Sequence, residues 1–269
     1  MTYRSILVQA EGGPHCRARL ACAVDLADRF GAMLLGLGAE MAPPGAMADP
    51  FGAWTAAILE QIEIDLVAAE GQFVTMAGDR PHRWSAVRDL PARALGDAAR
   101  AADLIVADSG SRGRAPYFSA DLGDLVLTAG RPVLIAPPGR ADLSARRVLV
   151  AWKDSREARR AVADALPFLT AAEEVVVVEA CDADHRDRAL DRAGAVAEHL
   201  ARHGVKARAA VADASDDDAG AVLIGQAVRM DADLIVAGGY GRSRLGEWVF
   251  GGVTRSLLDQ DERFVLLSH

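Results

Sequence analysis

One five-residue segment occurs twice in this chain, and this internal repeat limits the folds that the chain can adopt. Asp103-Leu-Ile-Val-Ala107 recurs as Asp233-Leu-Ile-Val-Ala237, 130 residues later. Ile6-Leu7-Val8 corresponds in the same way to Val148-Leu149-Val150, 142 residues later. Two copies of one unit therefore follow each other. The two offsets differ by twelve residues, so we expect extra length in the first copy, in the proline-rich segment 39–51.

Each copy shows the pattern of alternating strands and helices. Short apolar runs bounded by Gly, Pro or charged residues predict buried strands, and apolar residues at three- and four-residue spacing predict helices. In the first copy we expect strands at 5–8, 33–37, 83–88, 103–107 and 132–136, and helices at 14–30, 54–76, 91–100 and 120–129. In the second copy we expect strands at 147–151, 174–179, 205–211, 234–237 and 264–267, and helices at 155–169, 186–203, 217–230 and from about 251.

This order of elements predicts the fold class. Five strands joined by four helices form a mostly parallel open sheet with helices on both faces, so the chain is expected to be α/β with two tandem domains. A length of 269 residues suits two domains of ordinary size. Pro137-Pro138-Gly139 resembles a linker, which gives domains at 1–139 and 140–269.

Composition excludes several classes of protein. The formal net charge of −8 argues against a nucleic-acid-binding protein, which usually carries a basic face. No apolar run approaches the roughly 20 residues that span a bilayer, so we expect a cytoplasmic protein without membrane contact. Cys16, Cys22 and Cys181 form no CxxC pair, and buried thiols are expected. His199 and His203 share a helix face without a third ligand, so no metal site is predicted.

The second copy of the repeated segment leads into a glycine-rich connection with the spacing of a phosphate site. The pattern is Gly238-x2-Gly241-x9-Gly251-Gly252. Glycines let the backbone approach a ligand closely, and the free N–H groups at a helix start, here Gly251, Gly252 and Val253, favour an anion. Arg242 adds positive charge to the connection. A glycine-rich connection that binds nothing is the alternative.

This spacing resembles the nucleotide-binding signature of the universal stress protein family, whose usual form is G-x2-G-x9-G followed by Ser or Thr. Ala232-Asp-Leu-Ile-Val236 before the signature and Gly252-Val-Thr254 after it also look like that family. In its tandem form the resemblance covers the whole chain. The chain departs from the signature at Gly252, where the family carries a hydroxyl residue; the nearest hydroxyl belongs to Thr254.

The resemblance implies a stress-response protein that binds an adenine nucleotide in its second domain, with ATP as the cofactor, alone or with Mg²⁺. Lys153, two residues after Ala151, stands where the nucleotide-binding members carry an Asp that meets the ribose or adenine. Losing such an acceptor costs roughly 1.5–3 kcal/mol, or about ten- to a hundred-fold in affinity, so weakened or altered binding is expected. The base and sugar would contact Ala180, Ala237 and Gly238, and the phosphates would lie near Gly241, Arg242, Gly251, Gly252, Val253 and Thr254.

The same register applied to the first copy predicts that its site is lost. Asp108 stands at the position of Gly238. Glu11 follows the first strand of this copy, as Lys153 follows the first strand of the second copy. Carboxylates at Asp108 and Asp121 would repel phosphate. We expect this domain to serve as a packing partner or to bind something else.

Three functions remain open, and none of them assigns a catalytic residue. The chain has no Gly-x4-Gly-Lys-Ser/Thr loop and no recognisable Ser–His–Asp arrangement. It is a nucleotide-binding stress protein, a ligand-free scaffold that acts through dimerisation and partner binding, or a slow nucleotide hydrolase in which Asp182 or Asp184 orients water. The last strand of each copy lies at a sheet edge, and the resemblance implies a pseudo-dimer within the chain and a homodimer between chains.

Overall fold

The computed structural model describes residues 2–11, 16–45, 53–109, 115–239 and 252–269. These residues form two compact units, and the change from one to the next falls between Asp142 and Leu143. The strands and helices have ends that differ from the predicted ones by two residues or fewer. Within the described ranges, no helix combines the length and the apolar sequence needed to cross a bilayer.

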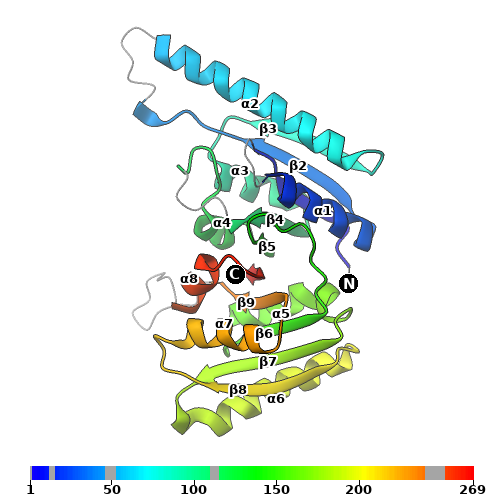
Figure 1. The fold of residues 1–269 in the computed structure, drawn as a ribbon, viewed down its shortest axis with the longest axis vertical. Coiled ribbons are helices and arrows are strands. Elements are labelled where there is room, and N and C mark those ends of the chain that lie inside the picture. Colours follow the sequence, from blue (N-terminus) through cyan, green and yellow to red (C-terminus); the bar gives the residue numbers. More distant parts are fainter. Residues whose placement is uncertain (1, 12–15, 46–52, 110–114, 240–251) are drawn as a thin grey trace. The chain divides into compact units, whose positions relative to one another are not determined.

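Strands and helices alternate through the first unit (Figure 1). Its strands are β1 (Ser5–Gln9), β2 (Met33–Ala39), β3 (His82–Val87), β4 (Leu104–Asp108) and β5 (Val133–Ala136). Its helices are α1 (Cys16–Phe30), α2 (Ala53–Ala77), α3 (Pro91–Ala98) and α4 (Leu122–Thr128). The strand order is β3-β2-β1-β4-β5, and each of these pairs is parallel.

The second unit repeats this arrangement. Its strands are β6 (Arg147–Trp152), β7 (Glu174–Cys181), β8 (Ala207–Asp213), β9 (Leu234–Gly238) and β10 (Phe264–Ser268). Its helices are α5 (Arg156–Leu169), α6 (Arg186–Arg202), α7 (Ala219–Arg229) and α8 (Gly252–Asp259). The order β10-β9-β6-β7-β8 is again parallel throughout. The predicted α/β class with parallel sheets in two successive units is confirmed.

The repeated segment forms the centre of each core. Ile105 and Val106 in β4 and Ile235 and Val236 in β9 have no exposed surface. A parallel strand covered by helices on both faces buries every side chain, which is why these strands are continuous apolar runs without alternation. The four-residue run Leu-Ile-Val-Ala therefore fits the middle of a sheet in both units.

The aspartate that opens the first copy of the segment joins two strands at the amino-terminal edge of the sheet. Asp103 Oδ2 accepts hydrogen bonds from the backbone N–H groups of Arg4 at 2.7 Å and Ser5 at 3.0 Å. The Ser5 hydroxyl donates to the same oxygen at 3.2 Å. The carboxylate thus fixes the entry to β1 beside the start of β4.

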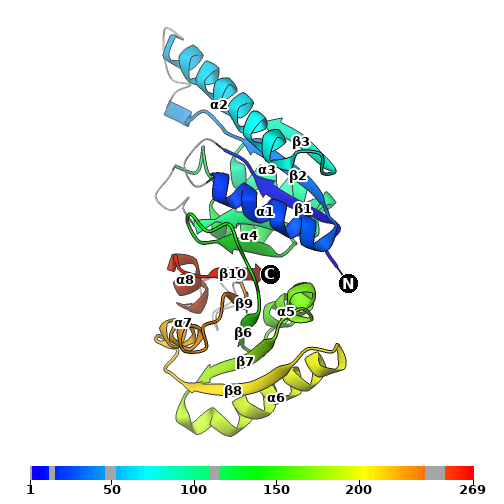
Figure 2. The ribbon, with the colours of Figure 1, turned by 45° about the vertical axis from the view of Figure 1, so that its right-hand side comes forward.

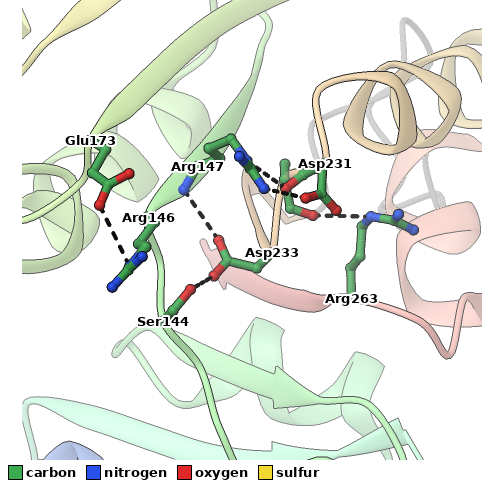
Figure 3. A network of polar contacts seen from close by, with 8 residues as sticks. Ser144, Arg146, Arg147, Glu173, Asp231, Asp233 and Arg263 are labelled. Atoms are coloured by element: carbon green, nitrogen blue, oxygen red, sulfur yellow. Dashed lines mark hydrogen bonds and ion pairs between the residues drawn. The ribbon is translucent and has the colours of Figure 1, made fainter.

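Asp233 repeats this role in the second unit (Figure 3). Its Oδ1 accepts the N–H of Arg147 at 3.4 Å, and its Oδ2 accepts the Ser144 hydroxyl. Nearby, Arg147 Nε donates to the carbonyl of Asp231 at 3.0 Å, and Arg263 Nε donates to that of Ala232 at 3.0 Å. The repeated aspartate is therefore structural, and it lies at the sheet edge opposite the predicted ligand site.

The extra length of the first unit is shared between the proline-rich connection and α2, which corrects the prediction that it lies in the connection alone. α2 has 25 residues, and the equivalent α6 has 17. α2 packs on β2 through one buried stripe, and glycines in β2 allow the close approach. A β-carbon at Gly36 would lie 2.7 Å from the Phe73 ring, and one at Gly38 would lie 2.9 Å from Leu66.

Candidate functional site

The strand order of the second unit places a topological switch between β6 and β9. From β6 the chain continues on one side through β7 and β8, and it later returns to the other side through β9 and β10. At the carboxyl ends of the two central strands, Ala151 lies opposite Ala237. Open α/β sheets bind ligands in the crevice outside the strand ends at such a point, because the crossovers diverge there. These two predicted site residues therefore meet at the expected place.

Small side chains line one face of the sheet at this switch point. Ala151 pairs with Val178, which lies two residues before Ala180 in β7, so Ala151, Ala180 and Ala237 point to the same face. Ala212 of β8 pairs with Ala180 and extends the row. We call these four residues the alanine row. Ala180 lies within β7, not after the strand as predicted, and it is half-buried whereas Ala151 and Ala237 are buried.

The helices that cover the two faces differ in their relation to the alanine row. Glu179, which points away from the row, accepts hydrogen bonds from Arg192 Nε of α6 at 3.1 Å. α6 therefore covers the face opposite the row, and α5 covers the same face, since it packs against Gly238, whose β-carbon position points away from Ala237. α7 packs on β6, β7 and β8 and contacts α8, and both lie on the other side of the strands (Figure 2). The row and α8 thus share one face.

Gly238 makes room for a helix. A β-carbon at this position would lie 2.6 Å from the backbone nitrogen of Ala158 and 2.9 Å from Glu157 Cβ, both in the first turn of α5. We expected this glycine to allow the close approach of a ligand. In the structure, α5 instead occupies the space where a side chain at position 238 would lie. A ligand on the face of the alanine row would meet Gly238 through its backbone alone.

The start of α8 is open to solvent. Gly252 is exposed, Val253 is half-buried and Thr254 is buried. A β-carbon added at Gly252 would have one neighbour within 4 Å among the described residues, the carbonyl oxygen of Asp216 at 3.9 Å. The first N–H groups of a helix have no partner inside the helix, and together with the helix dipole they favour an anion.

Charges of both signs surround this opening. Lys153 directly follows β6 and is exposed, and its ammonium forms no ion pair with a described residue. Its carbonyl accepts the Ser155 N–H at 2.7 Å, and the Ser155 hydroxyl caps α5 by accepting the Ala158 N–H at 3.2 Å. The run Asp216–Asp218 precedes α7. Lys153 would attract a phosphate, and the three carboxylates would repel it.

The Cys181 thiol at this edge is not activated, and the two neighbouring histidines of the second unit lie at the other end of α6. Cys181 ends β7 and is half-buried, which differs from the expected full burial. Desolvation, together with the negative charges of Glu179 and Asp213, raises the pKa of its thiol, so the thiol stays protonated at neutral pH. The rings of His199 and His203 pack 4.9 Å apart on the exposed side of α6. Within the described ranges, no three His, Cys, Asp or Glu residues are arranged to hold a metal ion.

Three of the predicted site residues, Gly241, Arg242 and Gly251, lie outside the described residues. The described ones lie in two places: Ala151, Lys153, Ala180, Ala237 and Gly238 at the carboxyl ends of the strands, and Gly252, Val253 and Thr254 at the start of α8.

In the first unit, a side chain of the protein itself takes the place of an anion at the equivalent helix. Asp121 precedes α4, and its Oδ1 accepts the Asp124 N–H at 2.9 Å. A carboxylate that caps the helix satisfies the donors that a phosphate would use, and it adds a repelling charge.

A buried polar network fills the carboxyl ends of the strands in that unit. Arg19 of α1 is 1% exposed; its Nε donates to the Gln9 carbonyl at 2.8 Å, and its Nη2 lies 3.6 Å from Glu11. Glu11 also accepts from the Gln9 amide and from the Ser119 hydroxyl at 3.5 Å. Arg19 and Ser119 were not among the predicted site residues. Arg19 carried a signal, because it interrupts the apolar face of α1 next to Leu20, where a charge requires a buried partner.

Solved structures share this fold over their full length. A universal stress protein from Archaeoglobus fulgidus DSM 4304 is 14% identical, with a TM-score of 0.70 over 98% of this chain and 95% of that chain. A protein described as a candidate universal stress protein from Pseudomonas aeruginosa UCBPP-PA14 is 20% identical, with a TM-score of 0.60 over 99% and 93%. A functionally unknown protein from Pseudomonas aeruginosa PAO1 is 19% identical, with a TM-score of 0.59 over 99% and 92%. No family model matches the chain, and no curated protein matches its sequence. The whole chain, with both of its units, has the fold of a universal stress protein.

Proposed function

We propose that this chain is a tandem universal stress protein whose second unit binds an adenine nucleotide, with ATP as the ligand. The observation that carries the proposal is that the alanine row and the open start of α8 share one face at the switch point. The row has no bulky side chain, so a flat base packs against it at the half-buried Ala180. The N–H groups of Gly252 and Val253 favour the phosphates.

The remaining residues have roles consistent with this placement. Lys153 extends from the end of β6 and pairs with a phosphate. Gly241, Arg242 and Gly251 add backbone and guanidinium donors to the phosphate end, and the buried Thr254 supports the first turn of α8. Mg²⁺ bound with ATP offsets the repulsion from Asp216–Asp218, because the cation reduces the charge of the triphosphate.

A leucine substitution in the alanine row tests the proposal. Ala180→Leu fills the space over the row, and Ala209→Leu makes the same change at a half-buried position on the opposite face of β8. Titration calorimetry with Mg-ATP should show binding by the wild-type protein and by Ala209→Leu, and an affinity weaker by about ten-fold or more for Ala180→Leu, because the base loses its surface.

Two outcomes favour the alternatives. If the wild-type protein binds no Mg-ATP at millimolar concentration, the ligand-free scaffold is the better account. If bound ATP is converted to ADP at a rate that Ala180→Leu abolishes, the site is a slow hydrolase. The proposal also includes a homodimer, and a light-scattering mass equal to one chain would contradict that part alone.

A further inference from the structure

The first unit has a groove between its longest helix and its outermost strand. A hollow of about 280 Å³ separates α2 from the end of β3. Its walls include Glu63, Val67, Glu70, Ala86, Val87 and Arg88. None of these residues belongs to the proposed nucleotide site, so the groove has no part in the function described above.

One wall of the groove is an unpaired strand edge. β3 is the last strand in the order of the sheet, with β2 as its neighbour. Leu34 N–H donates to the Pro81 carbonyl, and Glu40 N–H donates to that of Val87, so the odd-numbered residues of β3 turn their backbone groups toward β2. By the alternation of a parallel ladder, His82, Trp84 and Ala86 direct their N–H and C=O groups to the outer edge. Such a row of donors and acceptors is a template for another strand.

The other wall combines exposed apolar side chains with negative charge. Val67 on the α2 wall is 61% exposed, and Val87 on the β3 wall is 39% exposed. Val74 lies seven residues beyond Val67 on the same flank of α2, past the end of the hollow, and is 41% exposed. α2 carries four carboxylates, and no Lys or Arg occurs among its 25 residues. Arg88 Nη2 lies 2.6 Å from Glu63 Oε2, whereas Glu70 forms no ion pair with a described residue. The groove therefore has apolar surface and excess negative charge.

We propose that this groove binds an extended segment of a partner protein in which apolar and basic side chains alternate on one face. The segment pairs with β3 through backbone hydrogen bonds and lies under the flank of α2. Along that flank, Glu63, Val67, Glu70 and Val74 alternate acidic and apolar side chains at axial steps of about 4.5–6 Å. Side chains on one face of a strand repeat at a similar distance, about 6.6 Å. Alternating arginine and valine side chains of the partner segment therefore face the glutamates and valines of α2.

The charge of α2 argues against a second copy of this chain as the occupant. Antiparallel pairing of two β3 strands about a twofold axis would bring two α2 helices to the same side of the joined sheet. Each helix carries four carboxylates and no cation, so the contact would be repulsive. A basic segment meets the opposite situation, because Glu70 forms no ion pair with a described residue and Glu63 pairs only with the exposed Arg88.

Peptide binding to the full-length protein tests the charge pattern. The probe is fluorescein-labelled Ser-Arg-Thr-Val-Thr-Arg-Thr-Val-Ser, and the comparison peptide has Glu in place of Arg. Fluorescence anisotropy should show binding of the basic peptide, weaker by about ten-fold for the acidic one and reduced by added salt. Glu70→Gln should weaken the basic peptide about five-fold, whereas Glu198→Gln, the same change on the exposed side of α6, should have no effect.

Substitution and hydrogen exchange at β3 test the backbone pairing. Ala86→Pro removes an outward N–H and leaves the ladder to β2 intact, because proline is tolerated at a free edge. It should abolish peptide binding with unchanged circular dichroism. In the wild-type protein the peptide should slow amide exchange at His82, Trp84 and Ala86, and this measurement decides the question if Ala86→Pro does not fold.

Three results would overturn the proposal. The first is equal binding of the two peptides. The second is peptide binding without slower exchange at His82, Trp84 and Ala86. The third is a dimer that Ala86→Pro converts to a monomer, since a second copy of the chain would then occupy the edge.

Discussion

Asp121 precedes α4 in the first unit, and Gly252 is the first residue of the equivalent helix α8 in the second unit. Asp121 supplies a carboxylate that accepts the Asp124 N–H at the start of α4. Gly252 supplies no side chain. Among the described residues, the one atom within 4 Å of an added β-carbon would be the carbonyl oxygen of Asp216, at 3.9 Å. A carboxylate cap at a helix start repels phosphate, whereas the first N–H groups of a helix favour an anion. In the first unit the Asp121 cap thus adds to the buried network of Glu11 and Arg19 in disfavouring a phosphate.

Gly252→Ser should strengthen nucleotide binding. The new β-carbon meets no close neighbour among the described residues, and the added hydroxyl donates a hydrogen bond where the universal stress protein signature carries Ser or Thr. We expect Mg-ATP to bind about three- to ten-fold more tightly by calorimetry. Gly252→Ala is the matched control, since it adds the β-carbon without the hydroxyl and should give no gain. An equal gain from both variants would show that helix propensity, not the hydroxyl, is responsible.

Cys22 makes the stability of the protein sensitive to alkaline pH. Burial raises the pKa of its thiol from 9.0 to about 12, with Asp25 as a further cause. Above pH 9.0 the unfolded chain releases this proton, but the folded chain keeps it until about pH 12. The contribution of the thiol to stability is therefore complete below pH 9.0 and is lost as the pH rises through that window.

Urea denaturation of Cys22→Ala across the same pH range measures this effect. The unfolding free energy of the wild-type protein should fall more steeply with rising pH than that of Cys22→Ala. Cys181→Ala is the comparison, because its thiol is half-buried and its pKa is raised less by burial. Parallel curves for the wild type and Cys22→Ala would contradict the assignment.

At the scale of the element, α2 shows how the side-chain volume of a strand decides where a helix lies. The helix buries Ile62, Leu66, Ala69, Phe73 and Ala77, which recur at three- and four-residue steps on one face. It approaches β2 closely because Gly36 and Gly38 lack side chains where Phe73 and Leu66 press against the sheet. One flank of α2 beside this stripe is exposed, and Val67 on that flank lines the groove beside β3.

Two glycine substitutions should therefore have opposite effects on stability. Gly38→Ala places a β-carbon 2.9 Å from both Leu66 and Trp84, and the strain should lower the unfolding free energy by about 1–3 kcal/mol. Gly71→Ala lies on the exposed side of α2 with no neighbour within 4 Å, and it should raise stability by about 0.5–1 kcal/mol through helix propensity. Urea denaturation measures both, and a destabilised Gly71→Ala would show that this part of α2 is not a regular helix.

At the scale of the whole molecule, the sequence predicted the architecture because its signals were local and repeated. Buried parallel strands such as Leu234–Gly238 are uninterrupted apolar runs, and the two copies of the segment supported each other. Contacts across the fold were not predictable in the same way. The sequence showed a glycine at position 238 but not the helix turn at Ala158 that takes its space, and it did not show that Arg19 and Ser119 meet Glu11.

The two units together should bind one nucleotide per chain, not two. In the second unit Gly252 at the start of α8 is exposed and Ala180 of the alanine row is half-buried, whereas Asp121 and the network of Glu11 and Arg19 fill the equivalent place in the first. Calorimetry with Mg-ATP should give a stoichiometry of about one. Asp121→Gly should leave that value unchanged, because the buried network remains when the cap is removed. A stoichiometry of two in the wild-type protein would show that the first unit rearranges to admit the ligand, and a second site appearing in Asp121→Gly would show that the cap alone had closed it.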